Sequence, residues 1–506
     1  MCGFSGVVFT GEQARAGFQP GLDGFRRAAQ RVAHRGDTDH RELIRPLLWL
    51  SHFRLAFQDV AAGVQPMVSA DGSHVIVFNG EVYNHLALRP AIVRETGVAF
   101  RTRSDTETLI EGWLAFGDAF FERLEGEYAF VIAGMDGERL VAHRDRFGVK
   151  PLFLGVDGVD DRRFASFAPS YDFACPRLEL ASEIKGIASR KRWRHDGLLR
   201  QFTGLFEPIC TPFEGIIQLP PGGTLAAARR AAGGFACTLR TFVEPVRTAP
   251  TRNAVATEEA FEAAMQASVS ERLLSDVELG VYLSGGIDSK AIAFELSRAK
   301  GVGAGLKSFT VGFEHAGYDE TDEAVDYARF LGLDPHVIRI DGPALDYAYP
   351  RAVHTSELVQ PFTNGAAKWW LSLFAREHVL GVLTGDGADE VLCGYPSFRY
   401  INWWKHLLWK RGRRLPGRRI DELLQAAPLG SLAVDRLYAR RFAAHTKDPW
   451  LSGSSAEGSG DDFIGSLEVL GVQHPLFGQI RTIAESLLGP AAATHWLRAQ
   501  ADSVQS

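Results

Sequence analysis

The chain has 506 residues, an apolar fraction of 46% and a formal net charge of −6 at pH 7. This length predicts two or more domains with ample cores, and the charge predicts no general attraction to nucleic acid. No run of about 18 apolar residues occurs, so we expect no transmembrane helix. The five cysteines are odd in number, and the N-terminus shows no signal-peptide pattern. We therefore expect a cytoplasmic protein without a disulfide framework.

Cys2 is the first residue whose position suggests chemistry. Removal of the initiator methionine would leave cysteine with a free α-amino group, and that amine could serve as the base for its own thiol. Residues 4–9 after it have the pattern of a strand. Taken by position alone, Cys2 is more simply interpreted as a buried or incidental cysteine.

The next segments alternate short strands with two helical stretches. Their patterns predict strands over 48–56, 75–78, 126–132 and 139–144, and helices over 25–33 and 106–116. Asp105 precedes the second helix and is a candidate for its N-cap. This order of elements predicts a layered α/β sandwich for the first domain.

Three polar residues and one glycine in these segments suit the use of a thiol on the amide of an amino acid. The acyl intermediate needs oxyanion donors, which the Asn79 side chain and the Gly80 N–H could supply on a strand-end turn. The substrate also needs a cation for its carboxylate and an anion for its amine, and Arg54 and Asp105 fit those roles. Each has a structural alternative: a hairpin turn for Asn79 and Gly80, a surface ion pair for Arg54 and a helix cap for Asp105.

The second part of the chain has the pattern of a parallel sheet. Strands are predicted over 277–283, 307–313, 336–340 and 378–384, with helices between them, including 320–331 and 365–377. In such a sheet, ligands bind at the carboxyl ends of the strands.

The loop Ser284-Gly285-Gly286-Ile287-Asp288-Ser289 follows the first of these strands and opens a helix. Its glycines allow phosphate to approach the backbone, and the N–H groups of the first helical turn favour anions. Asp288 cannot bind phosphate directly, so it could hold a magnesium ion, which Asp389 could share. The alternatives are an ordinary turn at this loop and a solvated loop acid at Asp389.

Motifs in order along the first part resemble the class II glutamine amidotransferase domain of glutamine-hydrolysing asparagine synthetases. They are Met1-Cys2-Gly3, Ala33-His34-Arg35-Gly36, Gln65-Pro66-Met67, Asn79-Gly80-Glu81-Val82-Tyr83-Asn84, Ser104-Asp105, the stretch from Arg144 to Leu152, and Ser182-Glu183-Ile184-Lys185. The resemblance implies an N-terminal-nucleophile fold, a four-layer αββα sandwich. It implies Cys2 as nucleophile, Asn79 and Gly80 as the oxyanion hole, and Arg54, Glu81 and Asp105 as glutamine contacts. One departure is Asp37, where the family usually has proline.

The second part resembles the ATP-pyrophosphatase-type synthetase domain of the same family, which is a doubly wound parallel sheet. The resemblance implies ATP and Mg²⁺ as cofactors. It implies ATP contacts at Leu283, Ser284, Gly285, Gly286, Asp288, Ser289, Val311, Thr384 and Gly385, and the metal ligands expected from the residues themselves are Asp288 and Asp389. One departure is Lys290, where the family usually has a small hydroxyl residue.

Together these features predict four regions. They are a glutaminase domain over 1–225, a linker over 226–256, a synthetase domain over 257–400, and a divergent, shortened C-terminal region over 401–506. The resemblance implies an asparagine synthetase-like amidotransferase. Glutamine hydrolysis at Cys2 would release ammonia, which would attack an ATP-activated acyl-adenylate of aspartate or a similar carboxylate.

Alternatives to this function remain open from the sequence. The acceptor could be another carboxylate of a secondary-metabolite or cell-surface pathway, and its pocket is expected to include residues 360–364 and the Trp369-Trp370 pair. Ring-closing relatives generally lack the nucleophilic cysteine, so Cys2 argues against them. The oligomeric state, whether a homodimer or an assembly with a partner subunit, is not decided by the sequence.

The C-terminal region departs most from the resemblance. The family usually continues into a Ser-Met-Ala stretch and a lysine near the acyl-adenylate, and neither can be placed after Glu390. We therefore expect the isolated chain to hydrolyse glutamine but to amidate poorly, unless Lys290 or a partner chain supplies the missing cation. A basic, tryptophan-containing run over 401–419 could suit an anionic surface, but a solvated helix face is the simpler interpretation.

Overall fold

The computed structural model describes residues 2–9, 18–164, 168–202, 208–241, 254–301, 305–314, 319–358 and 364–392. The chain divides into two compact units, of which the first comprises residues 1–197 and 206–385 and the second comprises 198–205 and 386–506. Within the first unit, we call the described residues up to 241 the first half and those from 254 to 385 the second half. The predicted acceptor residues 360–363 and the basic run 401–419 lie outside the described residues.

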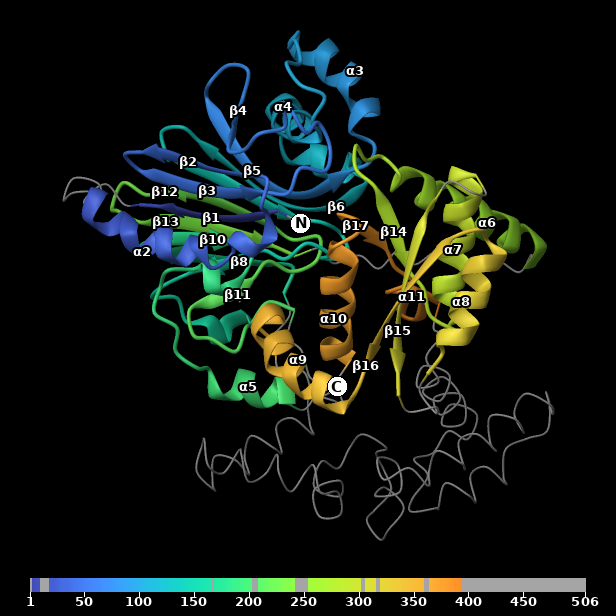
Figure 1. Ribbon diagram of the computed structural model, residues 1–506. Helices are drawn as coiled ribbons and strands as arrows, with labels where there is room; N and C mark the ends of the chain where they lie inside the picture. Colours follow the sequence, from blue (N-terminus) through green and yellow to red (C-terminus); the bar gives the residue numbers. More distant parts are fainter. Residues whose placement is uncertain are drawn as a thin grey trace, which may run out of the picture. The chain divides into compact units, whose positions relative to one another are not determined.

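The first half contains two antiparallel sheets (Figure 1). The six-stranded sheet has the order β11-β8-β10-β1-β3-β2. Its strands are β1 (Gly3–Val8), β2 (Asp39–Arg45), β3 (Leu48–Arg54), β8 (Phe153–Gly155), β10 (Leu178–Ala181) and β11 (Ile216–Gln218). The seven-stranded sheet has the order β4-β5-β6-β7-β12-β13-β9. Its strands are β4 (Met67–Val68), β5 (His74–Val82), β6 (Gly126–Gly134), β7 (Arg139–Arg144), β9 (Ser170–Cys175), β12 (Thr224–Arg229) and β13 (Phe235–Arg240).

Helices cover the outer faces of the two sheets and complete a four-layer αββα sandwich, which confirms the predicted fold. Helix α2 (Phe18–Gln30) packs on the six-stranded sheet, while α3 (His85–Thr96) and α4 (Asp105–Phe116) cover the seven-stranded one. The main core lies between the sheets and includes Phe4 and Val131. Because β1 is covered on both faces, all of its residues are buried. The thiol of Cys2 therefore stands at the start of an immobilised strand.

Shorter helical segments complete the described chain. They are the 3₁₀ turns Ala33–Arg35, Gly117–Arg123, Asp161–Phe164 and Ile184–Gly186, and the helices α5 (His195–Phe202) and α11 (Ala388–Leu392).

Two local predictions for the first half are wrong. Strand β5 does not end before Asn79 but continues to Val82, so Asn79 and Gly80 lie inside the strand, opposite Ala129 and Tyr128 of β6. The strand continues because β6 offers a partner along its whole length. The N-cap of α4 is Ser104, whose side chain accepts the Thr106 N–H, and Asp105 is already helical.

Strands β12 and β13 lie largely within the range 226–256 for which the sequence predicts a linker. They pair with each other, and β12 also pairs with β7 while β13 pairs with β9. The seven-stranded sheet thus continues to Arg240. Turn residues at 230–234 separate the two strands. The alternation of apolar and polar residues within each strand is too short to predict a strand beside the polar composition that follows.

The second half is a parallel sheet with helices on both faces, as predicted. The sheet has the order β16-β15-β14-β17. Its strands are β14 (Leu279–Tyr282), β15 (Lys307–Phe313), β16 (Asp334–Ile340) and β17 (Gly381–Leu383), and all their pairings are parallel. Helices α6 (Ala254–Glu271), α7 (Ile287–Lys300) and α8 (Thr321–Phe330) lie on one side of it, and α9 (Gly342–Ser356) and α10 (Asn364–Arg376) on the other (Figure 1).

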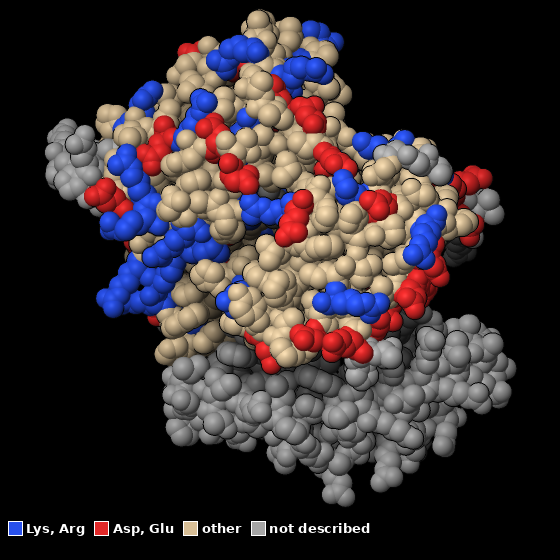
Figure 2. Space-filling view, in the orientation of Figure 1, with Lys and Arg blue, Asp and Glu red and all other residues tan. Residues whose placement is uncertain are grey.

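The described surface mixes charges of both signs. Figure 2 shows acidic and basic side chains interspersed over much of one face, with lysines and arginines gathered toward one edge. Within the described part of the chain, no helix combines the length and the apolar character needed to cross a membrane.

Candidate active sites

The Cys2 thiol rests against the backbone at the end of β3. The Leu55 N–H donates to Sγ at 3.4 Å, and Sγ lies 3.6 Å from the Leu55 carbonyl oxygen. Burial raises the pKa of the Cys2 thiol, while the Leu55 hydrogen bond and Arg54 lower it and Asp105 raises it. The charges expected to bind an amino-acid substrate therefore act directly on the thiol.

Arg54 is buried, and the backbone fixes its guanidinium. Nη1 donates to the Val60 carbonyl at 2.8 Å, and Nη2 donates to the carbonyls of Asp59 at 2.7 Å and Gln58 at 3.2 Å. Carbonyl oxygens orient the cation without neutralising it. Arg54 thus keeps the charge needed to bind a substrate carboxylate.

Asp105 is buried at the start of α4 and is held by backbone donors. Oδ2 accepts the Val82 N–H at 3.0 Å, and Oδ1 accepts the Thr106 N–H at 2.7 Å. Burial raises the pKa of Asp105 to about 6, although these hydrogen bonds lower it. The carboxylate is therefore fixed in place and carries its charge at neutral pH.

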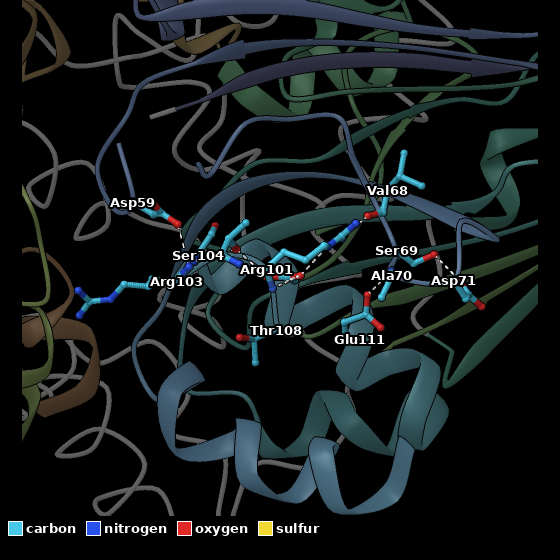
Figure 3. Close-up of polar contacts among 12 residues, drawn as sticks. Asp59, Val68, Ser69, Ala70, Asp71, Arg101, Arg103, Ser104, Thr108 and Glu111 are labelled. Carbon is cyan, nitrogen blue, oxygen red and sulfur yellow. Dashed lines mark hydrogen bonds and ion pairs between the residues drawn. The ribbon is translucent and has the colours of Figure 1, made fainter. Parts of the chain in front are cut away.

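A polar network holds the loop that leads into Asp105 (Figure 3). The buried carboxylate of Glu107 accepts the N–H groups of Arg101 and Thr102, and Arg101 Nη2 donates to the Val68 carbonyl at 2.6 Å. The Arg103 N–H donates to Asp59 Oδ2 at 2.8 Å. This network connects the Asp105 loop to the Arg54 loop.

Asn79 is fully buried, and neither polar atom of its side-chain amide has a hydrogen-bond partner among the described residues. Nearly all buried polar groups in native proteins are paired, so such an amide calls for an explanation. Gly80 follows with φ of +144°, and a Cβ there would lie 2.1 Å from the Glu127 carbonyl oxygen. An unsatisfied donor beside an obligatory glycine fits a site for a substrate oxygen.

Glu81 completes the group of predicted glutamine contacts. Gln58 Nε2 donates to Glu81 Oε2, and burial together with the Asp105 charge raises the pKa of Glu81 well above its ordinary value. The structure thus gathers Cys2, Arg54, Glu81 and Asp105 into one electrostatic environment.

Sequence reasoning missed the supporting residues of this site. Gln58 holds Glu81, and the Leu55 backbone holds the thiol. His52 Nε2 lies 3.0 Å from the Phe78 carbonyl oxygen and connects the two sheets, and its burial lowers its pKa to about 4. No local pattern marks Gln58. His52 does stand out in the sequence, because a histidine inside an apolar strand indicates a buried polar contact.

The predicted phosphate loop joins β14 to α7 and has ordered hydroxyls. The Ser284 N–H donates to Ser289 Oγ at 3.0 Å, and the Gly286 N–H donates to Ser284 Oγ at 3.1 Å. The Thr310 hydroxyl donates to the Leu283 carbonyl at 2.9 Å, and Val311 follows Thr310 in β15. The end of β14, where this loop begins, thus lies beside the middle of β15.

An anionic group already binds the backbone of this loop. The Gly285 N–H donates to Glu320 Oε2 at 2.9 Å, and a Cβ at Gly285 would lie 3.0 Å from carboxylate oxygens of both Glu320 and Glu323. The glycine backbone is therefore accessible to anionic oxygens, which fits the phosphates of ATP. Lys290 forms an ion pair with Glu323 and lies 5.6 Å from the ring centroid of Tyr327, so it is engaged in this structure.

Thr384 and Gly385 follow β17, the strand beside β14. A Cβ at Gly385 would lie 2.8 Å from the Ser289 nitrogen, so this segment packs closely against the start of α7. Asp389 lies on α11 in the second compact unit, and its magnesium site with Asp288 stays a prediction. Over the described residues, no group of three or more His, Cys, Asp or Glu side chains is arranged to hold a metal ion.

The Trp369-Trp370 pair, predicted to line the acceptor pocket, lies on α10. Trp370 Nε1 donates to the Ala344 carbonyl at 2.9 Å, and its ring stacks on Tyr347, so this tryptophan packs against α9.

A cavity of about 540 Å³ lies between the first and second halves. Leu55 lines it beside the Cys2 thiol, and Tyr282 lines it just before the phosphate loop. Glu357 closes one side, because its carboxylate accepts the N–H groups of Ile184 and Lys185, each at 2.5 Å. One cavity is thus lined both by Leu55, which contacts the Cys2 thiol, and by Tyr282, the last residue of β14.

Two family models match the chain in sequence order. The model for a glutamine amidotransferase domain matches residues 1–235, and the model for asparagine synthase matches residues 260–485. The second match continues well beyond residue 400, the predicted start of the divergent region.

Individual relatives agree with these matches. The chain is 29% identical over 403 residues to asparagine synthetase (glutamine-hydrolyzing) 1 of Bacillus subtilis (strain 168), with 79% of this chain and 60% of that protein covered. It is 30% identical over 432 residues to a Penicillium rubens protein named amidase chyE, with the same two coverages. It is 28% identical over 410 residues to an asparagine synthetase (glutamine-hydrolyzing) of Sandersonia aurantiaca, covering 79% and 68%. The chain thus spans 60% of the length of the first two relatives.

Proposed function

Because the chain joins a member of the glutamine amidotransferase domain family to a member of the asparagine synthase family, we propose that it is a glutamine-dependent, ATP-consuming amide ligase. The observation that carries the proposal is the buried, unpartnered Asn79 amide in the same half as the Cys2 thiol, which rests on the backbone beside the buried Arg54 cation. This combination suits amide hydrolysis through a thioester. A structural cysteine would not explain the unpaired amide.

In the first step, Arg54 binds the glutamine carboxylate, and Asp105 with Glu81 binds its ammonium group. The free α-amino group of Cys2 takes the thiol proton, and the thiolate attacks the side-chain carbonyl carbon while the Asn79 amide and the Gly80 N–H stabilise the oxyanion. As this intermediate collapses, the α-ammonium returns the proton to the leaving nitrogen, so ammonia departs and a glutamyl thioester remains. Water then hydrolyses the thioester to glutamate and restores the thiol.

In the second step, ATP binds at Ser284–Ser289 with Leu283, Val311, Thr384 and Gly385. An oxygen of the acceptor carboxylate attacks the α-phosphorus of ATP, pyrophosphate leaves, and an acyl-adenylate is formed. The loop fits this role because its Gly285 N–H already donates to a carboxylate oxygen of Glu320. Asp288 and Asp389 are the residues that would hold Mg²⁺, whose charge would offset that of the phosphates. Ammonia from the first site, travelling through the cavity that begins at Leu55, attacks the acyl carbon and releases AMP.

Aspartate is the first candidate for the acceptor, since the matching synthase model and two of the relatives are named for asparagine synthesis. A different carboxylate is the second candidate. This candidate is favoured because the chain is 30% identical to a protein named an amidase, which is as similar to the chain as the two synthetases are. The phosphate-loop chemistry is the same for both.

A product assay tests this function. The purified chain is incubated with glutamine, ATP, magnesium and a panel of carboxylic acids, and amide products are identified by mass. We expect one acid to gain the mass change of an amide, with glutamate, AMP and pyrophosphate formed alongside. Cys2→Ala should abolish product from glutamine and retain product from ammonia. Glutamine hydrolysis by Cys2→Ala would refute the nucleophile.

A further inference from the structure

The segment Phe57-Gln58-Asp59 contacts both the glutamine site and the second half. The ring of Phe57, its first residue, packs against the core of the second half that contains Leu279 of β14. A Cβ on Gly381 of β17 would lie 2.7 Å from this ring. Phe57 therefore packs where the first residues of β14 and β17 pair with each other.

The other two residues of the segment hold the groups expected to bind glutamine. The carbonyls of Gln58 and Asp59 both accept from Arg54, and the Gln58 side chain donates to Glu81. Asp59 Oδ2 accepts the Arg103 N–H, which fixes the loop before Asp105 (Figure 3). The three proposed contacts for glutamine thus share one support.

Asp276, just before β14, joins the segment to the second half by two hydrogen bonds. Its N–H donates to the Phe57 carbonyl at 3.0 Å, and its Oδ2 accepts the Asp59 N–H at 2.8 Å. Asp59 has φ of +45°, which a non-glycine residue adopts at a cost in free energy. Strain of this kind persists only where several contacts impose it, and Asp276 makes one of them.

We propose that Asp276 and Phe57 are positioning residues for glutamine, through which the second half holds Arg54 and the Asp105 loop in their binding arrangement. This inference rests on the proposed function and extends it, because it places part of the support of the glutamine site in the nucleotide-binding half. Neither residue touches the substrate. Their effect passes through the backbone of Asp59.

The test measures steady-state glutamate release from glutamine alone, so it needs neither ATP nor an acceptor. Asp276→Ala removes the acceptor for the Asp59 N–H, and the loss of one hydrogen bond predicts a rise of about 3- to 10-fold in KM for glutamine. We expect kcat to change by less than about twofold, because the thiol and oxyanion donors are untouched. Asp276→Asn keeps an acceptor oxygen and should restore KM to near the parent value.

Glu278→Ala is the matched control. Its carboxylate lies two residues farther along and pairs with Lys307 of the same half at 2.6 Å, so its removal should leave KM unchanged. Phe57→Leu, which keeps an apolar side chain but shortens its reach, should raise KM in the same direction as Asp276→Ala. It provides an independent test if Asp276→Ala does not fold.

An unchanged KM in the folded variants, or a loss confined to kcat, would overturn the inference. Such a result leaves the proposed function standing, because the parent would still hydrolyse glutamine. A parent that releases glutamate but forms no amide with any acid would contradict the ligase function alone. A parent that releases no glutamate would overturn both.

Discussion

At the scale of the residue, the Asn79 amide shows most directly that the first half is built for a ligand. Leaving a buried polar group without a partner costs about 1–3 kcal/mol. The fold accepts this cost inside a strand that pairs with β6 along its whole length. An oxyanion formed during hydrolysis would supply the missing partner.

Asn79→Ala should therefore separate activity from stability. We expect kcat for glutamine hydrolysis to fall by about 10²- to 10³-fold, the usual loss for one oxyanion donor. The unfolding temperature should change little, because the lost packing is offset by removal of the unpaired amide. Asn84→Ala is the control, since the Asn84 amide is paired with the Arg123 carbonyl and the Glu125 N–H outside the proposed site. A normal kcat in Asn79→Ala would contradict the oxyanion role.

The raised pKa of Asp105 leads us to predict that glutamine binding depends on pH. Burial raises its pKa to about 6, so its carboxyl becomes protonated as the pH falls through that value. The neutral acid no longer attracts the glutamine ammonium, and KM should rise as the pH is lowered below about 6. In Asp105→Asn, KM should be high at every pH and should lose this dependence. Initial rates of glutamate release across the pH range provide the measurement, and a flat KM for the parent would contradict the prediction.

The motifs predicted which residues occupy the first site, but not what supports them. Cys2, Arg54 and Asp105 carry chemistry that can be recognised from residue type and order. The roles of Gln58 and Asp59 depend on backbone atoms and on the contact with Asp276, more than 200 residues away in the chain. A local sequence pattern contains no record of such a contact.

At the scale of the element, β5 carries the oxyanion donors because it continues through Asn79 and Gly80. The sequence predicts a turn there, since Asn-Gly is a strong hairpin signal. Pairing with β6 overrides that local preference, and Gly80 is needed because the Glu127 carbonyl occupies the space of a side chain. In the same way, pairing with each other and with β7 and β9 explains why β12 and β13 form in a predicted linker.

Gly80→Ala tests the close pairing of β5 and β6. The new Cβ would lie 2.1 Å from a backbone oxygen, so the strands must separate, and we expect a loss of about 2–4 kcal/mol in the free energy of unfolding. Gly72→Ala is the matched control, because Gly72 also has positive φ but has no atom within 4 Å of the added Cβ. It should cost only about 1 kcal/mol. Denaturant unfolding of both variants gives the comparison, and equal losses would contradict the close approach.

At the scale of the whole molecule, the parallel sheet and its phosphate loop follow from the alternation of strands and helices. The Lys290–Glu323 ion pair was not predictable from the sequence, because its partners come from α7 and α8. It bears on the expectation that Lys290 replaces a missing lysine, since Glu323 must release Lys290 before that cation can reach a substrate. The expectation of poor amidation by the isolated chain stays a prediction about rate, so the amide product expected in the assays should form slowly. The asparagine synthase match to residue 485 shows that family likeness continues past residue 400.

Asp288→Asn should separate the two activities within one molecule. Loss of the carboxylate removes a predicted magnesium ligand, so pyrophosphate release should fall by at least about 10-fold. Glutamine hydrolysis should persist, because Asp288 belongs to the second half and has no role at the thiol. Asp389→Asn should behave in the same way if the two acids share the ion. Pyrophosphate release at the parent rate in either variant would refute the shared site.

The central claim, that one chain hydrolyses glutamine and transfers its ammonia to an ATP-activated carboxylate, is tested most directly by following the nitrogen atom. The parent is supplied with amide-¹⁵N glutamine, ATP, magnesium, the acceptor acid and unlabelled ammonium, and the amide product is analysed by mass. We predict a product enriched in ¹⁵N beyond the enrichment of the ammonia in solution, and no such enrichment with Cys2→Ala. Product that carries only the isotope composition of the dissolved ammonia, or the absence of amide, would contradict the account.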